Sequence, residues 1–81
     1  MTAGDFHLED GPEYAYAQLA NYIEARISDG TLPPGARLPG ERALAEEYGV
    51  ALGTVRNALR VLREKDLVVT TPSRGTFITR H

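Results

Sequence analysis

The chain is 81 residues long, 42% hydrophobic and 25% charged, values that are typical of one small globular domain and argue against a disordered chain. It contains no cysteine, which excludes disulfide bonds, cysteine-ligated zinc and thiol catalysis. The first residues contain neither a basic segment nor an apolar run, and no segment is apolar for long enough to span a bilayer. We therefore expect neither a signal peptide nor contact with a membrane.

The formal net charge of −2 is unevenly distributed along the chain. Residues 1–30 contain six acidic side chains and one arginine, whereas residues 52–81 contain six basic and two acidic side chains. Because binding depends on the local electrostatic potential more than on the total charge, residues 52–81 could face a polyanion. A solvated surface without a partner can be just as uneven, so charge alone leaves both interpretations open.

The chain divides at its first Gly-Pro pair. Residues 1–12 are predicted to form a flexible acidic arm, and residues 13–81 one folded domain. A helix is expected over residues 13–29, where apolar side chains recur at helical spacing, and Gly30 is placed to end it. Its apolar positions are Tyr16, Leu19, Ala20, Ile23 and Ile27.

A rigid turn containing two prolines separates this helix from the next. Residues 36–38 are expected to be briefly extended, since the residue before a proline disfavours the helical region. A second helix is predicted over residues 41–48, with Gly40 as its N-cap and Gly49 ending it. Val50, in the following turn, is expected to pack into the core.

A third helix is predicted over residues 52–65, with one apolar and one polar face. The apolar positions are Val55, Ala58, Leu59 and Leu62. The opposite face carries Arg56, Asn57 and Arg60, with Arg63 at its edge. Two helices joined by a tight turn, the second with an exposed polar face, have the geometry that places side chains in the major groove of DNA.

Two segments rich in β-forming residues follow, over residues 67–71 and 76–79. Residues 72–75, with the sequence Pro-Ser-Arg-Gly, are predicted to connect them as a hairpin. The predicted fold is therefore mainly α with a small β-hairpin: a winged helix-turn-helix, with three helices followed by a two-stranded wing.

The third helix carries the first group of candidate DNA contacts. Arg56 and Arg60 lie four residues apart and repel each other in water, a cost that binding to phosphates would offset. The helix opens with Leu52, Gly53 and Thr54, which leave room for close approach, and the Thr54 hydroxyl could bind a phosphate. A solvated helix face is the structural alternative.

Base-reading contacts are a second group. Asn57 could read adenine and Arg56 guanine, although either side chain could equally hold the DNA backbone. At the expected hairpin tip, Ser73, Arg74 and Gly75 could enter a minor groove, where narrow A·T tracts concentrate negative potential. An exposed turn arginine without a partner is an equally common arrangement.

Four segments of the chain together resemble the winged helix-turn-helix domain of the GntR family of bacterial transcription regulators. They are QLANYIEARI (residues 18–27), GTLPPGARLPGERALAEEYGV (30–50), TVRNALRVLREKDLV (54–68) and RGTFI (74–78). The resemblance extends from Tyr16 to Ile78, with the segments in order and at family-like spacing.

This resemblance implies sequence-specific binding of double-stranded DNA by a bacterial transcriptional regulator, a cytoplasmic, nucleoid-associated repressor rather than an enzyme. It places the recognition helix, residues 52–65, in the major groove and the wing, residues 72–75, at the minor groove. It also implies DNA contacts from Arg42, Thr54 and Arg56 and from the wing around Arg74 and Gly75.

The chain departs from the family pattern at several positions. Gly40 and the pair Ala51-Leu52 stand where the family often has serine and Ser-Arg, which removes a capping hydroxyl and a basic contact. The side chain of Leu52 could instead meet a thymine methyl group. Asp66 and Ser73 replace frequent glycines, and Asp tolerates the left-handed region better than most residues.

GntR regulators usually continue into a second domain that binds a small effector and dimerises. The 81 residues hold no such domain, so the chain is either free-standing or part of a longer regulator. A homodimer of this chain would have to use the first helix, the arm or the wing.

The sequence bears on two other classes of function, an enzyme and a protein-binding winged helix. An enzyme is disfavoured because His7 lies in the arm, His81 is terminal, and no nucleophile–base pair is recognisable, so we expect no catalytic residue. Ligands for a metal are not clustered, and neither metal nor cofactor is expected. A winged helix that binds another protein stays open, because a fold does not fix its function and the first half is acidic.

Overall fold

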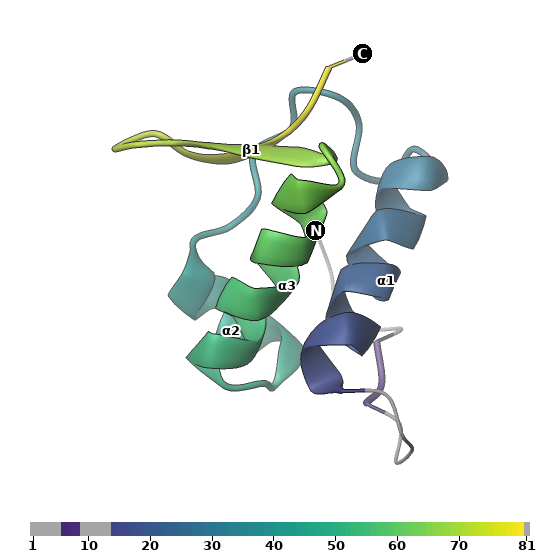
Figure 1. Cartoon of the computed structure of the whole chain (residues 1–81), viewed down its shortest axis with the longest axis vertical. Helices are drawn as coiled ribbons and strands as arrows, with labels where there is room; N and C mark the ends of the chain where they lie inside the picture. Colours follow the sequence, from purple (N-terminus) through teal and green to yellow (C-terminus); the bar gives the residue numbers. More distant parts are fainter. Residues whose placement is uncertain (1–5, 9–13, 81) are drawn as a thin grey trace.

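The computed structural model describes residues 6–8 and 14–80. Three helices precede an antiparallel hairpin (Figure 1). The elements are α1 (Ala15–Ser28), α2 (Glu41–Tyr48), α3 (Leu52–Glu64), β1 (Val68–Thr71) and β2 (Gly75–Ile78). The predicted order is confirmed, and the ends differ from the expected ones by one or two residues, as is usual for element ends. None of the described helices is long and apolar enough to cross a membrane.

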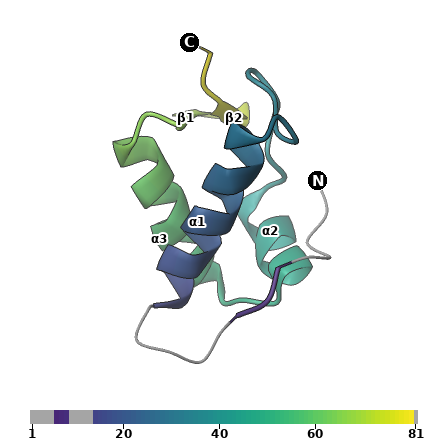
Figure 2. The ribbon, with the colours of Figure 1, turned by 90° about the vertical axis from the view of Figure 1, so that its right-hand side faces the viewer.

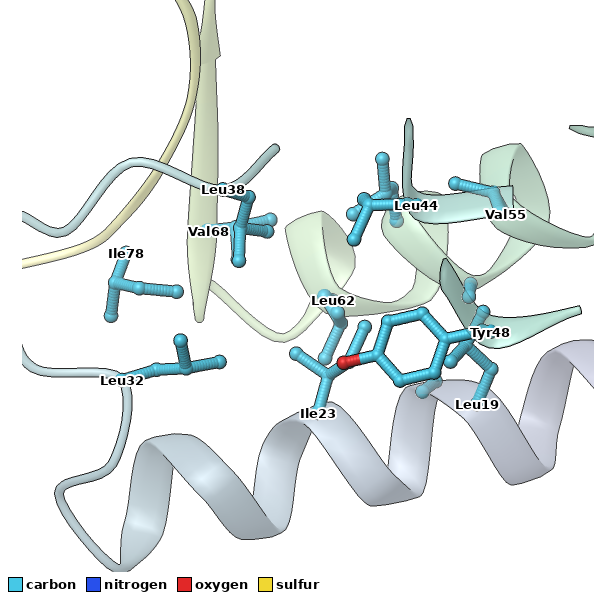
Figure 3. Packing of buried hydrophobic residues seen from close by; sticks show 13 residues of the cluster. Leu19, Ile23, Leu32, Leu38, Leu44, Tyr48, Val55, Leu62, Val68 and Ile78 are labelled. Carbon is cyan, nitrogen blue, oxygen red and sulfur yellow. The ribbon is translucent and has the colours of Figure 1, made fainter. Parts of the chain in front are cut away.

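The core lies between the helices and under the hairpin. α1 and α3 run side by side, and α2 crosses at their lower end (Figures 1 and 2). The predicted apolar face of α3 is confirmed, since none of its four side chains is more than 2% exposed. Figure 3 shows how side chains from all three helices meet those of Val68 and Ile78 on the hairpin. All buried side chains among the described residues are hydrophobic.

A tight turn joins α2 to α3. Gly49 ends α2 with a φ of +67°, a left-handed conformation that glycine adopts without a steric penalty. The N–H of Val50 then donates to the carbonyl oxygen of Ala45, at 3.0 Å. Val50 is half-buried and packs against the core, as expected. This turn sets the angle at which α3 leaves α2.

The wing is a regular antiparallel pair in which Val68 faces Ile78 and Thr71 faces Gly75. Its tip turns through a hydrogen bond from the Arg74 N–H to the Thr71 carbonyl oxygen, at 3.1 Å. Ser73 adopts a φ of +65° there, so the serine that replaces a family glycine still takes the left-handed conformation. The tip projects beyond the helices on the side of α2 (Figure 1).

A third extended segment completes the sheet. Residues 36–38 are extended, as predicted, and pair with β2, which the sequence does not predict. Arg37 lies opposite Phe77, the Leu38 N–H donates to the Thr76 carbonyl oxygen, and the Ile78 N–H donates to the Ala36 carbonyl oxygen. The two bonds are each 2.8 Å long. This pairing ties the segment before α2 to the wing.

Phe6 lies against the helical core. Its ring packs edge-on against the rings of Tyr22 and Tyr48, with both centroid distances 5.3 Å. This contact was not predicted from the sequence, which offered no periodic pattern before α1. The expected arm over residues 1–12 lies partly outside the described residues, and its division from a domain at residue 13 stays a prediction.

Candidate nucleic-acid interface

The exposed face of α3 carries the predicted group of basic and polar side chains. Arg56, Asn57 and Arg60 are all exposed, because the helical repeat places them opposite the buried apolar face. Arg60 donates to the Glu64 carboxylate one turn later, at 3.1 Å. α1 packs on the buried side of α3, so this basic face points away from α1 (Figure 2).

The start of α3 is open to a close partner. Ala51 supplies no side-chain cap, which leaves N–H groups of the first turn without a side-chain acceptor. A Cβ at Gly53 would meet no other described atom within 4 Å. Leu52 and Thr54 are half-buried on either side of it. The predicted room for close approach therefore exists at this end of the helix.

The start of α2 lies next to this face. Gly40 is the N-cap, as expected, and Arg42 in the first turn is exposed. Glu41 accepts a hydrogen bond from Arg56, with 3.2 Å between the carboxylate Oε1 and the guanidinium Nε. This ion pair links the two helices of the helix-turn-helix at their outer surface.

The wing supplies the third group. Ser73 and Arg74 are exposed at its tip, and Gly75 has a φ of +120°. A Cβ on Gly75 would approach Nε of Arg37 to 2.8 Å, so the arginine side chain lies across the glycine backbone. The positive φ favours glycine at this position.

A concave groove with a volume of about 350 Å³ runs between the wing, the start of α2 and α3. Its charged lining residues are Arg37, Glu41, Arg63 and Arg74. Arg63 donates to the Thr70 hydroxyl at 3.2 Å, and the Thr70 and Thr76 hydroxyls lie 3.0 Å apart. One acidic and three basic side chains make this surface electropositive.

Sequence reasoning missed Arg37 and left Arg63 at the edge of the site. The i+3 spacing from Arg60 was a signal for Arg63, because it places the two side chains on neighbouring parts of one helix face. No local signal existed for Arg37. It reaches the groove only through the pairing of its segment with Phe77, forty residues later in the chain.

The acidic side chains of α1 and of its C-cap form ion pairs away from this groove. Glu24 pairs with Lys65 at 2.8 Å, and Asp29 pairs with Arg26 at 3.0 Å. The hydrogen bonds of Thr31 hold the pKa of the Asp29 carboxyl below its usual value, and the charge of Arg26 adds to this effect. Burial raises the pKa of the Tyr48 hydroxyl well above the usual tyrosine range. Neither shifted group lines the groove.

Within residues 6–8 and 14–80, no group of three or more His, Asp or Glu side chains lies close enough together to hold a metal ion. The charged and polar groups of the groove are instead arranged along an open surface. Arginine guanidinium groups in such a setting suit phosphate oxygens and the acceptor edges of bases.

Comparison with known proteins identifies the architecture. The family described as bacterial regulatory proteins, gntR family, matches residues 15–78. The chain belongs to the GntR family. The resemblance and the winged helix-turn-helix fold predicted from the sequence are both confirmed.

Curated relatives within the GntR family are longer than this chain. The chain is 41% identical over 68 residues to the mannosyl-D-glycerate transport/metabolism system repressor MngR of Escherichia coli, covering 84% of this chain and 28% of MngR. It spans less than a third of the length of each of the first three curated relatives that it matches.

Solved structures show the same fold. A GntR family transcriptional regulator from Listeria monocytogenes superposes with a TM-score of 0.86 at 28% identity, over 91% of this chain and 64% of that one. AraR(DBD), solved in complex with operator ORX1, gives a TM-score of 0.80 at 30% identity, over 89% of this chain and 93% of that one.

Proposed function

We propose that this chain binds double-stranded DNA in a sequence-specific manner as a bacterial transcriptional regulator. The observation that carries this function is the groove between α2, α3 and the wing, where three arginines from three different parts of the chain meet. The operator complex of AraR(DBD) supports the assignment, because that protein shares the fold over most of both chains.

α3 would enter the major groove and the wing would lie at the adjacent minor groove. A major groove about 12 Å wide admits one α-helix, and the exposed face of α3 is free of bulky apolar groups over the described residues. Arg56 and Asn57 would meet base edges near the start of the helix. Arg74 at the wing tip would meet the minor groove, where an arginine is drawn to the negative potential of A·T-rich sequence.

The remaining polar groups suit the DNA backbone. Arg42 is exposed in the first turn of α2, Thr54 lies in the first turn of α3, and Arg60 is exposed further along α3. Arg37 and Arg63 line the groove beside the wing, where a strand of phosphates could pass between the wing and α3. Phosphate contacts of this kind fix the register of the protein on the duplex, and base contacts give the sequence preference.

The proposed DNA binding extends to the outcome of binding, the oligomeric state and the place in the cell. The likeness to the repressor MngR supports repression as the outcome of binding. We place this function in the cytoplasm of a bacterium, in association with its nucleoid. Two copies on a palindromic site would place their α3 helices one helical turn of DNA apart, about 34 Å. We infer that the chain binds such a site as a homodimer.

The test begins with selection of duplexes from random DNA by the folded chain. Fluorescence anisotropy then measures the affinity for a selected duplex and for a scrambled one at two salt concentrations. The affinity should fall steeply with salt, by a slope of about −0.9 for each phosphate neutralised, and the selected duplex should bind more tightly at both concentrations. A folded chain that binds neither duplex at low salt would exclude DNA as its partner and leave a protein partner for the winged helix.

A further inference from the structure

One ion pair on the proposed DNA-binding surface joins two elements. Among the described residues, Glu41 in the first turn of α2 pairs with Arg56 on α3, across 15 positions of sequence. A second ion pair on this face of α3, between Arg60 and Glu64, lies within the helix itself. Glu41 therefore acts on the position of Arg56 from outside its helix.

Stability does not explain this pair. The side chains of Arg56 and Glu41 are 61% and 44% exposed, and exposed ion pairs contribute little or nothing to the stability of a fold. A carboxylate on a DNA-binding face also opposes binding, because every phosphate of the duplex repels it. Glu41 thus adds little to the fold and weakens the attraction between this surface and DNA in general.

The geometry of the contact leaves the two terminal guanidinium nitrogens of Arg56 available to a base. The carboxylate of Glu41 engages Nε, and the described structure gives the two terminal guanidinium nitrogens no hydrogen-bond partner. Those two nitrogens can donate in parallel to O6 and N7 of one guanine in the major groove. A guanidinium held at Nε has already lost much of its side-chain freedom before it meets the base.

We propose that Glu41 is a positioning residue for base recognition: it holds the Arg56 guanidinium so that the group reads one guanine of the binding site. This role rests on the proposed DNA binding. Glu41 lowers the affinity for any duplex through its charge and raises the affinity for the correct duplex through Arg56. Its effect is therefore on discrimination between sequences.

The structural alternative is a helix-terminal role. Glu41 lies in the first turn of α2, whose N-cap Gly40 gives no side-chain hydrogen bond, and an acidic residue there is favoured by the helix dipole. Glu41→Asp keeps a carboxylate in the first turn and shortens the side chain by one methylene. It therefore separates the charge at the helix end from the contact with Arg56.

The experiment uses a duplex selected by the unmodified chain and a scrambled duplex of the same length and composition. In the selected duplex each guanine is replaced in turn by 7-deazaguanine, which lacks the N7 acceptor. We expect one replacement to weaken binding of the unmodified chain by about tenfold, within the range of one bidentate contact, and to have no effect on Arg56→Ala.

Glu41→Ala should lose the response to 7-deazaguanine at the same position, bind the selected duplex about tenfold more weakly and bind the scrambled duplex more tightly. Glu41→Asp should also lose the response, although the helix end keeps its charge. In the Arg56→Ala background, Glu41→Ala should no longer weaken binding to the selected duplex. Thermal unfolding of each variant confirms that it is folded at the assay temperature.

Glu64→Ala is the matched control. It removes a carboxylate from the same face of α3, but its partner is Arg60, so the response at the guanine read by Arg56 should stay. Three results would each show that Glu41 has no positioning role. Glu41→Ala could bind the selected and the scrambled duplex more tightly by the same factor, or Glu41→Asp could respond to 7-deazaguanine like the unmodified chain. The third is that Arg56→Ala responds to 7-deazaguanine at every position as the unmodified chain does. If the unmodified chain selects no duplex, the proposed DNA binding itself fails.

Discussion

The two faces of α3 show how this domain separates folding from recognition. On one face, Val55, Ala58, Leu59 and Leu62 are almost completely buried against α1, α2 and the hairpin. On the other, Arg56, Asn57 and Arg60 are exposed, and the ion pairs of the two arginines add little to stability. The same thirteen residues thus hold the core together and present a surface for a polyanion. Substitutions on the two faces should therefore have separable effects.

The largest effect is expected on the buried face. Leu62 is 0% exposed and does not line the groove. Leu62→Ala removes buried methyl groups and leaves a cavity, so the free energy of unfolding should fall by about 2–5 kcal/mol. Chemical denaturation measures this change. DNA affinity per folded molecule should stay within about twofold; a loss of affinity in fully folded protein would show that the two faces are coupled.

Arg56→Ala should show the opposite pattern. It removes one proposed base contact, so the affinity for a selected duplex should fall by about 5- to 100-fold, while the melting temperature stays nearly unchanged. Lys65→Ala is the control, because it also removes one positive charge but from a pair with Glu24 of α1. If both variants weaken binding equally, net charge and not the α3 face determines affinity.

The junction between α3 and the wing allows a gain in stability. Asp66 has a φ of +59° and carries a negative charge just beyond the C-terminal end of α3. Asp66→Gly relieves the strain of the left-handed conformation and removes an unfavourable charge from the end of the helix. Glycine loses more backbone entropy on folding, which offsets part of this gain, so the free energy of unfolding should rise by about 0.5–1 kcal/mol.

Asp66→Asn separates the two causes. It keeps a residue that tolerates positive φ and removes the charge, so its gain should be smaller than that of the glycine variant. Thermal unfolding of both variants alongside the unmodified chain gives the comparison. A loss of stability in Asp66→Gly would mean that contacts of the aspartate outweigh the strain.

The smallest effect is expected at Tyr48. Its hydroxyl is buried and forms no hydrogen bond with a described residue, and burial raises its pKa. Tyr48→Phe should therefore raise the free energy of unfolding by up to about 1 kcal/mol. Above about pH 10 the tyrosine of the unfolded chain ionises while the buried one does not, so the unmodified chain should lose stability there and the variant less. Equal pH profiles would contradict the assigned burial effect.

The helices could be predicted from the sequence because their signals are local. An apolar repeat of three and four residues identified all four buried positions of α3, and Gly49 marked the turn before it. The hairpin followed from β-forming residues around residues 72–75. Asp66 and Ser73 both have a positive φ. This is consistent with the glycine that the family often has at these two positions, because glycine adopts a positive φ without a steric penalty.

Features that depend on long-range packing could not be predicted. Arg37 reaches the groove through pairing with β2, Glu41 meets Arg56 across the helix-turn-helix, and Phe6 packs on Tyr22 and Tyr48. Each contact joins segments whose separation in sequence exceeds the period of any local pattern. Sequence therefore indicated which helix would face a partner, and the structure added the residues that complete and orient that surface.

An NMR map of backbone amide shifts, recorded with and without a selected duplex, tests the location of the interface most directly. DNA binding with α3 in the major groove and the wing at the minor groove predicts the largest changes in the first half of α3, around Arg42 and in residues 72–75. The exposed face of α1 should change little, since it lies on the other side of the core. Changes concentrated on α1, with α3 and the wing unaffected, would contradict the proposed interface.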